Sequence, residues 1–119
     1  SLFEQSAERG GRIVGLTNWR LAGLKKAIED KRLPSFRELT MMSDHQFYEE
    51  DRGDNYAQSR YLLYFLQQQG RLRSFYATFR KNRAADPTGY ATLVTTLGET
   101  DMRAFQARWE DWVLTLRYP

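Results

Sequence analysis

The sequence has no cysteine, a single histidine and only three prolines among its 119 residues. The lack of cysteine excludes disulfide bonds and thiolate chemistry, and it leaves the compartment open, because many secreted domains also lack cysteine. A metal site needs several histidine, cysteine or carboxylate ligands at suitable spacing. The one histidine, His45, lies in a polar stretch that is typical of a protein surface. We therefore expect that this chain holds no metal ion or other cofactor by itself.

Long apolar runs are also absent. No segment of about 18 consecutive apolar residues occurs, so we expect no membrane span. Residues 1–10 lack the basic start and the apolar stretch of a signal peptide. The first residue is Ser1 rather than methionine, and we expect the chain to be a processed product or an excised piece of a longer protein.

Complete catalytic motifs are missing as well. The sequence has no G-x-S-x-G elbow for a serine nucleophile, and Gly10-Gly11 does not extend into a phosphate-binding loop. The acidic stretch 49–54 lacks the spacing of a calcium-binding loop, so we interpret it as a solvated loop. We therefore expect no complete active site within this chain.

The sequence does contain clear helical periodicity. Apolar residues make up 41% of the chain and aromatic residues 14%, which is the composition of a folded domain. Apolar residues recur at i, i+3, i+4 and i+7, and the alternation that marks strands is nearly absent. Such stripes cover residues 21–28, 72–79, 90–97 and 102–116. We predict one all-α domain, residues 1–119, with about six or seven helices.

The segment 54–69 differs from the other predicted helices. Residues 61–66 are apolar nearly all round, which predicts a central helix that is surrounded by the others. Gly70 should end this helix, and the next helix should begin at once with Arg71. The two helices are therefore expected to form a tight αα-hairpin.

Capping residues mark several other helix boundaries. Residues 35–38 and 43–46 both fit the capping box, in which a serine and a Glu or Gln three residues later satisfy each other's backbone donors. Asp86 is the predicted N-cap of the helix over 90–97, with Pro87 at its first position. Gly98 should end that helix.

A basic helix face and a weak repeat suggest other functions. The predicted helix over 71–83 has a basic outer face that nucleic acid could use, but such a face is more often simply solvated, so we expect no nucleic-acid partner. Tyr56 and Tyr90, each followed by alanine, are 34 residues apart, which is the tetratricopeptide period. The apolar residues 62–66 would then align with the mostly polar 96–100. A tetratricopeptide-like helical module for protein–protein interaction is the alternative function.

Residues 54–66 contain the Tyr-x-Gln-Ser sequence at 56–59, and the helix they begin should end at Gly70; this segment resembles one of gluzincin zinc metallopeptidases. The resemblance is to the bacterial peptidase MA-like group, in which this segment lies downstream of the zinc site. Residues 1–4 are similar to the segment directly after the family's Trp-x-x-Glu-Gly-x-Ala motif, and residues 93–112 are similar to its closing helices. The resemblance covers most of the chain.

The resemblance implies a role for one residue and the lack of several others. In the family, zinc is held by the histidines of H-E-x-x-H and by a Glu that precedes the part resembled here, so no metal ligand carries over. Tyr56 matches the tyrosine that, in related aminopeptidases, donates a hydrogen bond to the oxyanion that forms at the peptide carbonyl. Residues 57–59 depart from the Glu-Lys-Gly of those enzymes. Gln58 and Arg60 are close to Tyr56 in sequence and would share its cleft.

The implied function is that of a helical C-terminal domain that forms a wall of a peptide-binding cleft and is not catalytic alone. Zinc is expected in an upstream domain of the same parent protein, and a peptide is the implied substrate. A secreted or periplasmic parent fits the resemblance, although no targeting signal in the sequence fixes the compartment.

Overall fold

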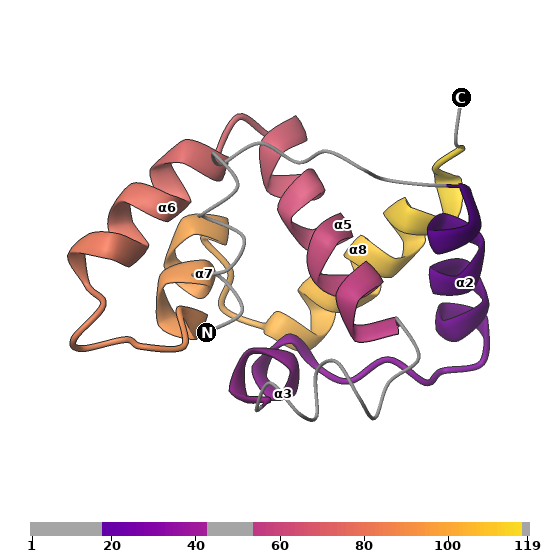
Figure 1. Cartoon of the computed structure of the whole chain (residues 1–119), viewed down its shortest axis with the longest axis horizontal. Helices are drawn as coiled ribbons and strands as arrows, with labels where there is room; N and C mark the ends of the chain where they lie inside the picture. The colour runs from indigo at the N-terminus through magenta and orange to yellow at the C-terminus, as the bar shows by residue number, and fades with distance from the viewer. Residues whose placement is uncertain (1–17, 43–53, 118–119) are drawn as a thin grey trace.

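The fold is organised around α5 (Asp54–Gln68) in the computed structural model, which describes residues 18–42 and 54–117. Figure 1 shows α5 at the centre of the molecule, and in both views the other helices lie around it. These described residues contain no strand, which confirms the predicted all-α class. The five other described helices are α2 (Asn18–Glu29), α3 (Phe36–Met41), α6 (Leu72–Lys81), α7 (Tyr90–Leu97) and α8 (Met102–Thr115).

The apolar half of α5 is the middle of the core. Leu62, Leu63 and Leu66 have no exposed surface, although Leu63 points about 100° around the helix axis from Leu62. Burial on several sides requires partners on several sides, and α2 and α6 both pack extensively on α5. The prediction of a central helix over 54–69 is therefore confirmed.

The first turns of α5 differ from what its composition suggests. They are largely polar, yet they are as buried as the apolar turns that come after them. Buried polar groups need specific partners: the Gln58 amide bonds the Pro34 carbonyl of a neighbouring segment, and the Ser59 hydroxyl bonds the Tyr56 carbonyl within the helix. The buried polar residues of this half are Asn55, Gln58, Ser59 and Arg60.

The connection from α5 to α6 is a Schellman turn. Gly70 has φ +70°, and its amide bonds the Gln67 carbonyl at 3.0 Å. The Arg71 amide bonds the Leu66 carbonyl at 2.8 Å, which completes the motif. The left-handed backbone explains the glycine, since other residues adopt this conformation at a cost. The predicted tight hairpin is thus confirmed, with α6 beginning at Leu72.

The start of α7 differs from the prediction. The helix begins at Tyr90, and Gly89 occupies the N-cap position with φ +78°. Pro87 therefore lies in the preceding turn and not at the first helical position. Asp86 still caps the helix, because its carboxylate accepts bonds from the Thr92 amide and hydroxyl, both at 2.8 Å. The prediction identified the capping side chain correctly and placed the helix start too early.

Replacing Asp86 with alanine should lower the free energy of unfolding by about 1–2 kcal/mol, because buried Thr92 would lose the acceptor for its amide and hydroxyl. Urea unfolding of the variant and the parent chain gives this difference. Asp111→Ala removes an exposed carboxylate from α8 and should change stability by less than about 0.5 kcal/mol. Equal losses in the two variants would contradict the capping role.

The short helix α3 is anchored on α8. Its capping box is present as predicted, with Ser35 accepting from the Glu38 amide and Glu38 accepting from the Ser35 amide. The Phe36 ring packs edge-on against Trp109 of α8, with centroids 5.0 Å apart. The second predicted capping box, residues 43–46, lies outside the described residues, as do residues 1–17.

The helices form a globule rather than a superhelical stack. α2 packs on α5 and also reaches α8, where Lys25 donates to the Leu116 carbonyl. In a solenoid each repeat contacts only its neighbours, so this early-to-late contact is not the expected geometry of a tetratricopeptide array. The radius of gyration is 13.5 Å, about that of a compact domain of this length. None of the described helices is long and apolar enough to cross a membrane.

Candidate functional site

Tyr56, the residue singled out by the sequence, lies in the first turns of α5. It is partly buried and packs against the hydrophobic core. The Arg20 guanidinium of α2 lies over its ring, 4.3 Å from the centroid, and that of Arg60 lies 5.8 Å away. Both distances are within the range of cation–π attraction. The ring of Tyr56 is therefore oriented by two cations from two different helices.

Arg60 and Gln58 differ in how they relate to Tyr56. Arg60 is 4% exposed, and its guanidinium lies over the tyrosine ring. Gln58 is fully buried and donates its amide to the Pro34 carbonyl at 2.9 Å. Its amide oxygen has no hydrogen-bond partner within the described part of the chain. Gln58 thus ties α5 to the segment before α3, and its amide is engaged there.

The other sequence candidates are not brought to Tyr56. His45 and residues 49–53 lie outside the described residues. Asp54 begins α5 and pairs with Arg32 at 2.7 Å. Across residues 18–42 and 54–117, no three His, Cys, Asp or Glu side chains come together in a way that could hold a metal ion. The described part of the chain therefore offers no set of residues that fits zinc.

The basic outer face of α6 is exposed, but Arg71 and Arg83 of the predicted pattern lie outside the helix. Arg73, Arg80 and Lys81 are exposed on the helix as predicted. Arg71 precedes the helix and donates to the Thr96 and Leu97 carbonyls, at 3.2 and 3.4 Å. A cation at the carbonyl end of a helix stabilises its dipole, so Arg71 has a structural role at the end of α7.

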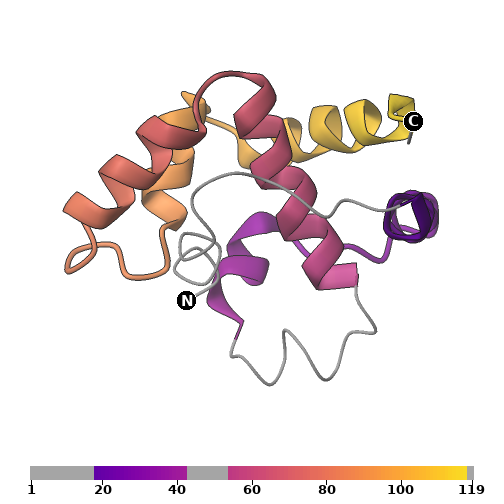
Figure 2. The same ribbon diagram turned by 45° about the horizontal axis from the view of Figure 1, so that its top comes forward.

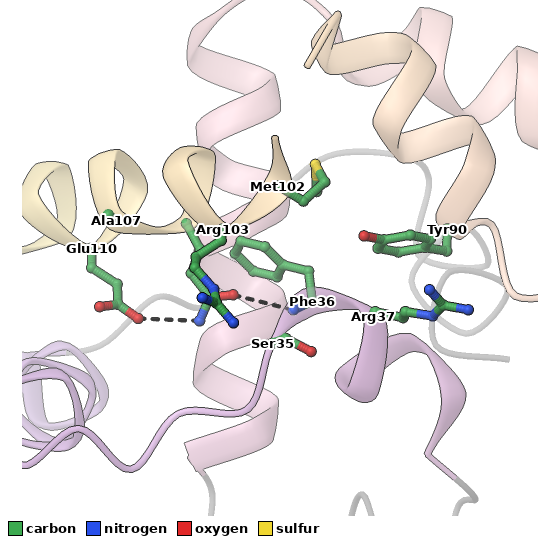
Figure 3. Close-up of a pocket in the computed structure, with 9 residues that line it drawn as sticks. Ser35, Phe36, Arg37, Tyr90, Met102, Arg103, Ala107 and Glu110 are labelled. Carbon is green, nitrogen blue, oxygen red and sulfur yellow. Dashed lines mark hydrogen bonds between the residues drawn. The ribbon is translucent and has the colours of Figure 1, made fainter. Parts of the chain in front are cut away.

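A groove of about 480 Å³ lies between the start of α3, the start of α7 and the first turns of α8. Figure 3 shows side chains from all three helices around it. Its volume is within the range of about 300–1,000 Å³ that ligand sites occupy. The groove is separate from Tyr56, which is not among its lining residues. Those residues are Ser35, Phe36, Arg37, Tyr90, Met102, Arg103, Gln106, Ala107 and Glu110.

Gln106 fixes the wall of this groove. Its amide nitrogen donates to the Pro34 carbonyl at 3.0 Å and to Glu110 at 3.1 Å. Its amide oxygen accepts from the Phe36 backbone amide at 3.2 Å. The two dashed lines in Figure 3 are the bonds to Phe36 and Glu110. These bonds hold the start of α3 on α8, so the groove is built on a defined framework.

A smaller cavity of about 270 Å³ lies where α5, α7 and α8 meet, and it offers less chemistry. Its arginines already have partners: Arg71 bonds the end of α7, and Arg108 pairs with Glu99. Aromatic rings of Phe65, Phe105 and Trp109 form the rest of its wall. We interpret it as a packing defect between helices.

Sequence reasoning missed the groove because its lining comes from three separate segments. Arg37 lies inside a capping box, Tyr90 in an apolar stripe and Arg103 in the first turn of α8, and no local spacing connects them. Only the amphipathic starts of α3 and α8 carry a signal, and that signal is common to many helices.

In comparisons with family models, curated proteins and solved structures, nothing matches this chain.

Proposed function

We propose that this chain is a helical domain of a gluzincin-like zinc metallopeptidase, where it forms one wall of the peptide cleft and contributes Tyr56. The zinc and the general base belong, in this proposal, to a separate upstream domain of the parent protein. The chain alone should hydrolyse no peptide. The proposal rests on the similarity of residues 54–66 and 93–112 to the peptidase MA-like group.

One structural observation supports a functional rather than a purely structural tyrosine. The ring of Tyr56 is only partly buried, whereas Ala57 and Tyr61 on the same helix are buried. Arg20 and Arg60 hold that ring by cation–π contacts at 4.3 and 5.8 Å. A phenol held in a defined orientation can act as a preorganised hydrogen-bond donor, because little reorganisation is needed when charge develops.

The chemical task of Tyr56 would be to donate its hydroxyl hydrogen to the carbonyl oxygen of the scissile peptide as that oxygen becomes negative. The two guanidinium groups beside the ring would favour negative charge nearby. Zinc in the upstream domain would supply the remaining electrophilic chemistry. The part of this chain's own residues is therefore orientation and hydrogen bonding.

The test is Tyr56→Phe in the full-length parent protein, with hydrolysis of a fluorogenic peptide as the readout. Removing one oxyanion donor should lower kcat by about 10²-fold with little change in KM. Tyr64→Phe changes another partly buried tyrosine of α5, whose ring packs on Trp112, and should leave kcat unchanged. Full activity of Tyr56→Phe would contradict the role given to this residue.

The parentage has its own test. The parent gene should encode H-E-x-x-H and a later Glu-Gly upstream of Ser1, and the lack of this motif would remove the catalytic proposal. Calorimetric titration of the isolated 119-residue chain with zinc should show no tight site. Submicromolar binding of zinc would contradict the assignment of the metal to another domain.

The tetratricopeptide-like alternative has less support from the arrangement of the helices. The packing of α2 on α8 and the unequal helix lengths differ from a stack of regular pairs.

A further inference from the structure

We propose that the groove between α3, α7 and α8 binds a peptide segment that carries an acidic side chain next to an apolar one. This site goes beyond the cleft role of Tyr56, because the two share no residue. It rests on the charges, the hydrogen bonds and the shape of the groove, and it stands whether or not the parent is a peptidase.

The groove carries positive charge. Arg37 and Arg103 come from different helices, and both are exposed. Within the described residues, neither guanidinium has an ion pair or a hydrogen bond, whereas Arg32 and Arg108 are paired with carboxylates. Guanidinium groups bind carboxylates through two parallel hydrogen bonds, which makes an acidic side chain their natural ligand.

The other polar groups of the groove already have partners. Ser35 is engaged with Glu38 in the capping box. Gln106 makes bonds to Pro34, Phe36 and Glu110. The lining side chains with unused hydrogen-bond donors, in the part of the chain described, are Arg37, Arg103 and Tyr90. All three donate, so the groove is suited to an acceptor that bears negative charge.

Apolar side chains line the groove between the charged ones. The side chains of Met102 and Ala107 line the groove alongside the arginines, over the buried ring of Phe36. Methionine adapts its shape to different apolar partners, which suits a peptide side chain. A free inorganic anion would use the arginines and leave this surface uncovered. A peptide with neighbouring acidic and apolar side chains uses both.

Glu110 gives the bound peptide a direction. In the view of Figure 3, Glu110 and Arg37 lie at opposite ends of the residues drawn, and Arg103 lies between them. The Glu110 carboxylate would repel a second acid at its end of the groove. The acidic side chain of the ligand is therefore expected toward Arg37 and Tyr90, at the end of the groove away from Glu110.

The experiment titrates the 119-residue chain with two capped pentapeptides, followed by amide chemical shifts in NMR and by calorimetry. The first peptide is acetyl-Gly-Leu-Asp-Phe-Gly-amide, and the second has Asn in place of Asp. The acidic peptide should bind saturably, shifting amides of α3 and the start of α8, and the Asn peptide should bind at least about tenfold more weakly. Equal binding of the two, or no saturable binding, would overturn the proposal.

Paired variants separate the groove from general electrostatic attraction. Arg37→Gln combined with Arg103→Gln should weaken binding of the acidic peptide at least about tenfold. Arg73→Gln combined with Arg80→Gln removes the same charge from the exposed face of α6 and should weaken it less than about twofold. Glu110→Gln should strengthen binding about two- to threefold, because it removes the repelling carboxylate.

The outcomes of these variants are decisive in both directions. Equal weakening by the two double variants would assign the binding to overall charge and overturn the proposal. Loss confined to the groove variant, with unchanged unfolding by urea, would support it. Binding of acetate or of the capped Asp residue with the affinity of the pentapeptide would also overturn it, since the apolar surface would then contribute nothing.

Discussion

Trp109→Ala should lower the free energy of unfolding by about 3–5 kcal/mol, which is the usual cost of removing a fully buried large aromatic side chain. Trp109 has no exposed surface and is the largest fully buried side chain in the described core. Its ring lies edge-on to that of Phe36, with centroids 5.0 Å apart and planes at 78°. Its indole nitrogen donates to the Tyr61 carbonyl at 3.4 Å. One side chain therefore joins α8 to both α3 and α5.

The measurement is urea unfolding of the variant against the parent chain, at a temperature where both are folded. Small domains are stable by only about 5–15 kcal/mol, so the variant should lose a large share of its stability. Leu114→Ala on the same helix is the control. Leu114 is 38% exposed, and its removal should change stability by no more than about 0.5 kcal/mol. Trp109→Phe keeps a ring in place, so its loss of unfolding free energy should lie between those of Trp109→Ala and Leu114→Ala. Similar losses in all three variants would contradict this account of the core.

The helical class and most helix boundaries could be predicted because their causes are local. The stripe of Leu72, Phe75, Tyr76 and Phe79 is entirely buried, as its spacing predicted. Gly70 and Gly98 end helices in left-handed conformations, as glycine after an apolar stripe indicates. These features depend on residues within a few positions of each other, so a single sequence carries them.

The burial of the polar start of α5 could not be predicted in the same way. Gln58 is fully buried because the Pro34 carbonyl, 24 positions earlier, accepts its amide proton. The same carbonyl accepts from Gln106 of α8. This three-segment junction depends on how the helices are arranged in space, and hydrophobic periodicity contains no information about it. The same reason applies to the groove that Gln106 supports.

Tyr56 was singled out by the family resemblance alone. The structure adds the residues that surround its ring. The sequence placed Arg60 four positions away on the same helix, where it faces the tyrosine ring. It gave no sign of Arg20, which reaches the ring from α2 at 4.3 Å. A contact between side chains of α2 and α5 depends on how the two helices are rotated about their axes relative to each other. Hydrophobic periodicity indicates only which apolar side chains face the core.

Phe36→Ala should lower the free energy of unfolding by about 3–5 kcal/mol as well, because Phe36 is the main anchor of a very short helix. Helix α3 has six residues, which is too few to be stable without tertiary packing. Phe36 is 1% exposed and contacts the rings of Phe105 and Trp109, with centroid distances of 5.8 and 5.0 Å. Its loss should detach α3 from α8 and abolish peptide binding in the groove that it helps to line.

The double variant of Phe36→Ala and Trp109→Ala tests whether the two rings act as a unit. Because each single variant already removes the ring–ring contact, the double variant should lose less than the sum of the two, by about 1 kcal/mol or more. Urea unfolding of the four proteins gives this coupling free energy. The losses of unfolding free energy in Phe36→Ala and Leu114→Ala should instead add in the double variant, since Leu114 is exposed and is not part of the hydrophobic core. Additivity of the Phe36 and Trp109 variants would mean that α3 is held mainly by the backbone and amide bonds to Gln106, and Gln106→Ala would then be the more damaging change.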